Sequence, residues 1–111
     1  MQDFYDAIKH LAGGEVYAVV APQTAQYPSL VYTPVDQTHV VAIDGPGALK
    51  RSRVQVDAYA RTLEVCDQLQ DQVLAALMAD IHTFADVRMS LTDFDQDAQV
   101  YRVSVDFTYY R

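Results

Sequence analysis

The chain has 111 residues, the length of one domain, and 50% of them are hydrophobic, which is typical of a folded rather than a disordered protein. Its formal net charge of −7 argues against general binding to DNA, because affinity for nucleic acid comes largely from neutralising phosphates. A single cysteine, Cys66, excludes an internal disulfide, and no apolar run is long enough to span a bilayer, so no membrane partner is expected.

The N-terminal third of the chain predicts one helix and two strands. Apolar residues recur at helical spacing after Asp3, a candidate N-cap, and the helix is expected to end at Gly13–Gly14. Residues 15–20 and 29–35 then alternate as strands. Pro34 cannot donate to a strand ladder, so the second strand lies at a sheet edge or is broken there. The acidic start, with no long apolar run behind it, predicts no signal peptide and synthesis in a cytoplasm-like setting.

Residues 36–50 form the longest irregular stretch, around an Asp-Gly-Pro-Gly turn signal at residues 44–47. Apolar residues before the turn allow the flanking strands to extend into a long hairpin arm. A stretch of this length in so small a domain usually has a function or is mobile. Lys50, Arg51 and Arg53 then form a basic cluster. It fits a phosphate backbone, an acidic patch on a neighbour, or simply a solvated strand entry.

The middle of the chain pairs a strand with a helix. Residues 53–59 alternate strictly, which predicts a strand with one buried and one solvated face. The apolar spacing then becomes helical as far as residue 81, with Thr62 as the predicted N-cap. This helix must lie on the apolar side of a sheet. Two further strands are predicted over residues 86–94 and 99–110.

Opposite charges suggest how the last strand pairs with the central one. In an antiparallel arrangement, one register sets Arg53 opposite Asp106 and Asp57 opposite Arg102. This pairing predicts the strand order 2-3-5-4. The expected fold class is α+β: a single mainly antiparallel sheet of four to five strands with two helices packed on one face, as one domain over residues 1–111.

No pattern in the chain points to catalysis. Asp93, Asp95 and Asp97 resemble the start of a calcium loop, but Ala98 and Ser104 stand where that loop needs Gly and Glu. A solvated hairpin turn is therefore favoured there. The three histidines lack ligand neighbours at useful spacing. We expect no enzyme, no metal and no cofactor.

Five segments stand in a specific order and spacing that covers nearly the whole chain: Val19–Gln23, Tyr27–Tyr32, Asp44–Pro46, Arg53–Ala60 and Tyr101–Phe107. Together they resemble the bacteriophage tail-completion family, which includes tail-terminator and tail-to-head joining proteins of long-tailed phages. The resemblance implies an α/β sandwich that assembles with copies of itself into a ring, typically a hexamer. It implies that this ring sits on the end of the tail tube protein, stops tube polymerisation and offers a docking face to the head-tail connector protein.

The same resemblance implies a place in the virion tail at its neck end, synthesis in the host cytoplasm, and no catalysis or cofactor. DNA is expected to pass through an acidic lumen without specific binding. Contacts with neighbouring subunits or the tube are expected in the outward charged rows and the arm: Asp44, Lys50, Arg51, Arg53, Asp57, Arg102 and Asp106.

Two other classes of function stay open. A small α/β ligand-binding or regulatory module predicts a closed apolar pocket with convergent polar groups. A sheet-based RNA binder predicts exposed aromatic side chains flanked by basic residues on the open face.

Overall fold

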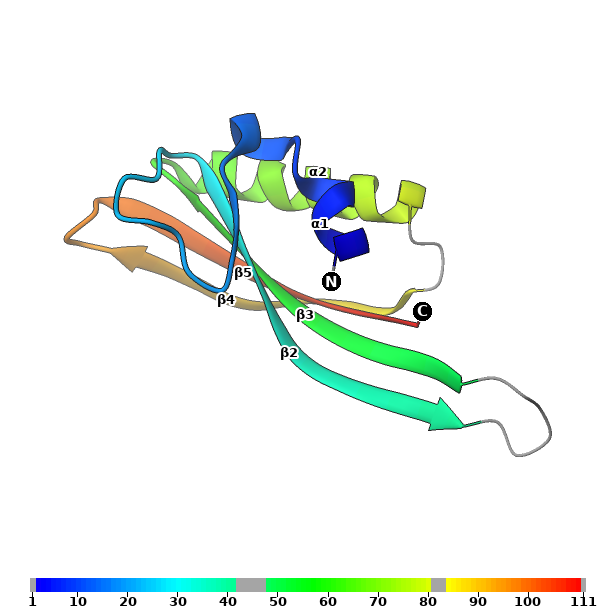
Figure 1. Cartoon of the computed structure of the whole chain (residues 1–111). Coiled ribbons are helices and arrows are strands. Elements are labelled where there is room, and N and C mark those ends of the chain that lie inside the picture. The colour runs from blue at the N-terminus through cyan, green and yellow to red at the C-terminus, as the bar shows by residue number, and fades with distance from the viewer. Residues whose placement is uncertain (1, 42–47, 81–83, 111) are drawn as a thin grey trace.

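The computed structural model describes residues 2–41, 48–80 and 84–110 (Figure 1). A twisted five-stranded sheet carries both helices on one face (Figure 1). The elements in chain order are α1 (Gln2–Ile8), a 3-10 turn η1 (Leu11–Gly14), β1 (Val16–Ala18), β2 (Ser29–Val41), β3 (Ala48–Ala60), α2 (Leu63–Asp80), β4 (Phe84–Asp95) and β5 (Val100–Tyr110).

The sheet order is β1-β2-β3-β5-β4. Only the short pairing of β1 with β2 is parallel among the described strands, and the other three pairings are antiparallel. The predicted α+β class, with a mainly antiparallel sheet and helices on one face, is confirmed. The predicted order 2-3-5-4 is also confirmed, with β1 added beside β2.

The core lies between the sheet and the helices. Val54, Val56 and Ala58 of β3 alternate into it, as predicted, and are fully buried against the apolar stripe of α2. Removing one such aliphatic side chain from water contributes about 1.5–3 kcal/mol. At the start of α2, the amide of Val65 donates to Thr62 Oγ1 at 3.3 Å, which confirms the predicted N-cap.

Helix α1 is shorter than predicted. It ends at Ile8, and Asp3 lies inside its first turn instead of capping it. Its packing explains why so short a helix is stable: Phe4 is fully buried, and its ring centroid lies 5.8 Å from that of Tyr32. Gly13 and Gly14 do adopt the expected left-handed conformation, with φ of 64° and 90°, but they do so in the 3-10 turn after the helix.

The register of β3 against β5 differs from the prediction by two residues. Arg53 stands opposite Thr108 and Asp57 opposite Ser104, so the expected charge pairs do not face one another. A two-residue shift keeps every side chain on its predicted face, so burial of the apolar rows is preserved in both registers. A cross-strand charge pair contributes only about 0.2–1 kcal/mol and does not decide between them.

Register shifts interrupt the ladders at three places among the described strands, and one of them, between Phe84 and Asp86, lies at the start of β4. The β2–β3 register shifts between Pro34 and Asp36, directly after the proline, and β1 does not pair with this part of β2. Pro34 thus lies at both a break and an edge, as predicted. In β4 a second shift between Met89 and Leu91 puts Leu91 opposite Ser104, on the face away from the helices. Regular alternation through the predicted strand at residues 86–94 would place Leu91 on the same face as Met89, and the shift makes that expectation wrong.

The hairpin arm, residues 36–41 and 48–53, extends β2 and β3 beyond the helices (Figure 1). Its described ladder runs to the pair Val41 and Ala48, which confirms the predicted extension of both strands. The arm gives the molecule an elongated shape of 53 × 23 × 22 Å. The predicted turn at residues 44–47 lies outside the described residues, and so does Asp44.

Candidate functional site

The sheet face away from the helices carries the predicted charged rows, but it is less solvated than expected. Asp57 is 7% exposed, and Ser104 and Thr108 are also buried. The segment that joins β1 to β2 borders this face and encloses, with Val31, Asp57 and Tyr59, a hollow of about 320 Å³. Sequence alternation assigns the face correctly, but it does not show that a connecting segment covers part of it.

Asp57 is an internal acceptor and does not project toward solvent. Its Oδ1 accepts hydrogen bonds from Gln55 Nε2 at 3.0 Å and from Ser104 Oγ. A buried carboxylate requires such donors, because an unpaired buried charge is strongly unfavourable. The contact of Asp57 with a neighbouring subunit remains a prediction. The burial of Asp57 argues against it, because the carboxylate already has hydrogen-bond donors inside its own subunit.

Arg102 on β5 contacts side chains of both β3 and β4 on the same face of the sheet. Its guanidinium donates to Asp93 on β4 at 3.0 Å and bonds the hydroxyl of Tyr59 on β3. Burial raises the pKa of the Tyr59 phenol above its usual value, and the hydrogen bond from Arg102 partly offsets that rise. Arg102 therefore stabilises the sheet within one subunit.

Arg53 and Asp106 retain an interaction in spite of the register difference. They lie diagonally across β3 and β5, with Arg53 Nε 4.0 Å from Asp106 Oδ2. Asp106 Oδ1 is buried and has no hydrogen-bond partner within the described part of the chain. A buried acceptor of this kind gains free energy from any donor that reaches it.

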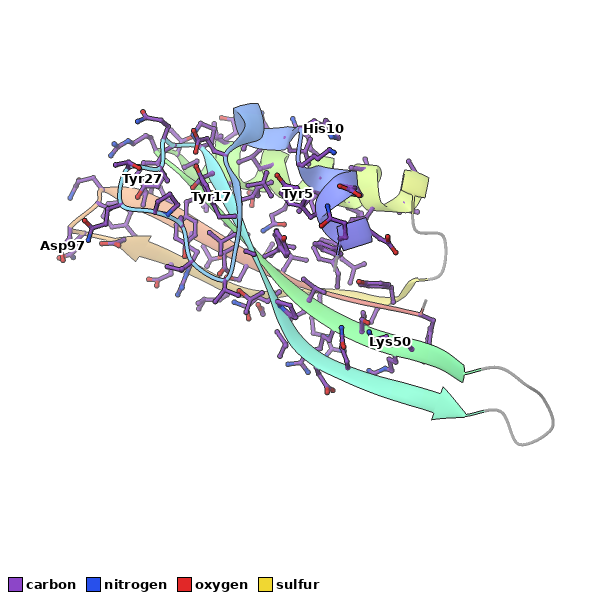
Figure 2. The ribbon with its side chains drawn as sticks, viewed as in Figure 1. Tyr5, His10, Tyr17, Tyr27, Lys50 and Asp97 are labelled. Atoms are coloured by element: carbon purple, nitrogen blue, oxygen red, sulfur yellow. The ribbon has the colours of Figure 1, made fainter. Side chains whose placement is uncertain are left out.

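The basic cluster lies on the arm. Lys50 and Arg51 belong to β3, and in the view of Figure 2 Lys50 sits on the part of the hairpin that leads away from the helices. Arg51 pairs with Thr38 on one side and with Tyr110, the last residue of β5, on the other. The structure therefore brings Lys50, Arg51 and Arg53 together at the base of the arm, while Arg102 and Asp106 stay within the sheet.

A groove between α2 and β4 has no counterpart in the sequence predictions. This α2–β4 groove measures about 410 Å³ and is lined by Asp67, Gln70, Asp71, Leu74, Val87, Met89, Val105 and Phe107. Two apolar side chains of the edge strand β4 are exposed at this groove: Met89 is 61% exposed and Val87 is 40% exposed. Exposed apolar side chains on an edge strand are typical of a contact surface.

Gln70 is the polar residue that sequence reasoning missed. It is 6% exposed, and its Oε1 has no hydrogen-bond partner among the described residues. Its position was detectable, because it follows Cys66 by four residues and precedes Val73 by three, and both are fully buried on the apolar stripe of α2.

The acidic turn between β4 and β5 is structural. Asp95 Oδ1 accepts hydrogen bonds from the amides of Asp97 and Ala98 at 3.0 and 3.2 Å, which fixes the turn and supports the hairpin interpretation. Within residues 2–41, 48–80 and 84–110, no group of three or more His, Cys, Asp or Glu side chains is arranged to hold a metal ion. Over the same ranges, no helix has both the length and the apolar character needed to cross a membrane.

Known proteins resemble this chain in sequence and in fold. Residues 5–110 match the model of the family described as Tail completion protein gp17. No curated protein sequence matches the chain. A chain of the solved structure titled "Virion of native gene transfer agent (GTA) particle" is similar, with a TM-score of 0.52 and 12% sequence identity, over 96% of this chain and 90% of that chain. At this identity the similarity shows a shared fold.

Proposed function

The chain belongs to the Tail completion protein gp17 family and is a structural protein of the phage virion tail, and from this premise we propose that it terminates the tail tube. Copies of the chain form a ring, a hexamer, on the last ring of the tube protein. The ring stops tube polymerisation and presents its other side to the head-tail connector protein. The subunit is made in the host cytoplasm and ends at the neck of the tail, and it acts without catalysis.

One structural observation supports ring formation. The sheet has two different free edges among its described strands: β4 at one end of the order, and the arm part of β2, beyond the short β1 pairing, at the other. Two unlike surfaces on one subunit favour a head-to-tail contact, and head-to-tail contacts close into rings when the rotation fits. The similar chain from a gene transfer agent virion has this fold inside an assembled particle, which agrees with such a role.

The net charge of −7 suits a passage for DNA. We propose that part of this acidic excess lines the lumen, so that DNA passes without binding. A lumen lined mostly by Lys and Arg in an assembled ring contradicts this part of the proposal.

The alternative functions receive less support. The hollow between the β1–β2 segment and the sheet combines Asp57 with apolar and aromatic residues, and its volume of about 320 Å³ is at the lower end of the usual range for ligand sites. On the open face, the β3 and β5 rows carry Asp, Gln and Ser beside Arg53 and Arg102. RNA recognition by a sheet requires exposed aromatic side chains with basic neighbours there, whereas Tyr59 is partly buried and hydrogen-bonded to Arg102.

Negative-stain microscopy of tails tests the proposal. Tails from a phage that lacks this protein are expected to be overlong and headless. Adding the purified protein during assembly is expected to give tubes of uniform length with a ring at one end, which then join heads. Uniform, head-joined tails in its absence refute tube termination. A monomer in solution does not, because the tube end can template the ring.

A further inference from the structure

The arm is a basic, weakly supported hairpin. Lys50, Arg51 and Arg53 account for three of the eight Lys and Arg residues in an otherwise acidic chain. The last residue of β5, Tyr110, pairs with Arg51, so beyond this point the described arm is a ribbon of two strands. A two-stranded ribbon is at best marginally stable in water, so the arm gains stability from a partner surface.

The α2–β4 groove offers the complementary surface. Its apolar side chains Val87 and Met89 are exposed, and Asp67 and Asp71 border it from α2. Helix α2 contains four acidic residues and no Lys or Arg between positions 63 and 80. The groove also contains Gln70, whose buried Oε1 lacks a donor among the described side chains and amides. The groove therefore combines exposed apolar area with negative charge.

We propose that the arm of one subunit docks in the α2–β4 groove of the next copy in the ring. This inference rests on the proposed ring and assigns the contact that builds it. In the sheet order, β3 and β5 separate β2 from β4, so arm and groove are different surfaces and the contact is head-to-tail. Lys50 meets Asp67 and Asp71 as the apolar floor of the groove is covered. Arg51 projects from the opposite face of the two-stranded ribbon and adds to the positive charge of the arm.

Charge reversal tests the contact in assembly. A chain with Lys50→Glu and Arg51→Glu has two acidic sites that repel, and a chain with Asp67→Lys and Asp71→Lys has two basic ones. Each alone is expected to cap tail tubes at least tenfold less well than the unchanged protein. An equimolar mixture is expected to recover capping, because each altered arm then meets a complementary groove in alternating order. Such alternation closes only rings with an even number of subunits.

A matched control shows whether charge reversal at any surface position, and not only at the proposed contact, reduces capping. Asp6 of α1 and Lys9, directly after that helix, form an exposed ion pair at 3.5 Å, and charge reversal at both positions is expected to leave capping unchanged. Each variant is also melted, since retained cooperative unfolding shows that the change affects assembly and not folding. Folded single variants that cap normally overturn the docking proposal, and so does a mixture that recovers nothing.

Cross-linking gives an independent readout. Lys50→Cys and Asp71→Cys are placed in separate chains, each with Cys66→Ala, and mixed on tube ends. A disulfide-linked dimer is expected only in the mixture. Rings without this dimer, or equal self-linking of the Lys50→Cys chain, overturn the docking proposal and leave tube termination standing. Absence of rings even from the unchanged protein overturns both.

Discussion

Gln70 on α2 bonds the backbone of two sheet strands at once. Its Nε2 donates to the carbonyl oxygen of Val56 on β3 at 2.8 Å and to that of Val103 on β5 at 2.7 Å. Both bonds are buried, so this side chain fixes the position of the helix over the two central strands. A position fixed by two directional bonds is more specific than one set by apolar packing alone.

Replacing Gln70 tests this bridge. Gln70→Met keeps the volume and removes both donors, and we expect a loss of about 1–3 kcal/mol in the free energy of unfolding. Gln70→Glu is expected to destabilise more at pH 7, because a buried carboxylate then faces two carbonyl oxygens. That deficit should narrow as the pH falls, since a protonated carboxyl can donate. Urea unfolding at pH 5 and pH 7 measures both, and equal stability of the two variants at pH 7 contradicts the bridge.

The Thr62 cap gives a second prediction. Thr62→Ala removes the acceptor for the Val65 amide and should cost about 1 kcal/mol, or about 4–8 °C in Tm for a chain of this size. Thr62→Ser keeps the hydroxyl and serves as the matched control. Differential scanning calorimetry distinguishes them, and a Thr62→Ala variant that melts with Thr62→Ser shows that the cap contributes nothing.

These two residues mark what sequence can predict. The cap was predictable because it depends on a local pattern, a hydroxyl just before the apolar helical repeat. Gln70 lies in an equally local pattern, yet its role depends on carbonyl groups 14 and 33 residues away in the chain. Sequence spacing alone places such a residue in the core, but it does not identify its partners.

The sheet shows the same limit. Alternation predicted the strands, because a strand with one apolar face must bury it. The strand order came from matching opposite charges on the third and fifth strands, which gave the right neighbours with a register two residues off. Alternation failed at Leu91, since a bulge between Met89 and Leu91 leaves no mark in composition. It also treated Asp57 as solvated, because the cover over that face comes from the separate β1–β2 segment.

The buried contact between Asp57 and Ser104 can be measured directly. Ser104→Ala leaves the carboxylate with one donor fewer and should destabilise the fold by about 1–3 kcal/mol. Asp57→Asn should also destabilise, and the double variant should lose less than the sum of the two. A double-mutant cycle by urea unfolding gives the coupling. Full additivity contradicts the contact.

Alkaline pH should weaken the fold through Tyr32. Burial raises the pKa of its phenol above the usual value for tyrosine, and the neighbouring Tyr5 raises this pKa further. A raised pKa means that folding favours the neutral phenol, so this contribution is complete below pH 10 and falls as the pH rises further. Tyr32→Phe should flatten the decline in unfolding free energy between pH 9 and pH 11, and the more exposed Tyr27→Phe should not. If the unfolding free energy falls equally steeply with pH in the unchanged chain, Tyr32→Phe and Tyr27→Phe, the decline does not come from Tyr32.

Substitution of Met89 tests subunit assembly with little effect on the stability of the fold. Its side chain is 61% exposed at the α2–β4 groove, so Met89→Lys removes little buried area and should change the free energy of unfolding by no more than about 0.5 kcal/mol. The new cation would nevertheless repel the basic arm of a docking copy and remove apolar contact area. Met78→Lys is the matched control, because Met78 is 57% exposed on α2 and does not line the groove. Both variants should melt like the unchanged chain, while only Met89→Lys should lose capping of tail tubes under the microscope. Equal capping by the two variants places the subunit contact elsewhere on the surface.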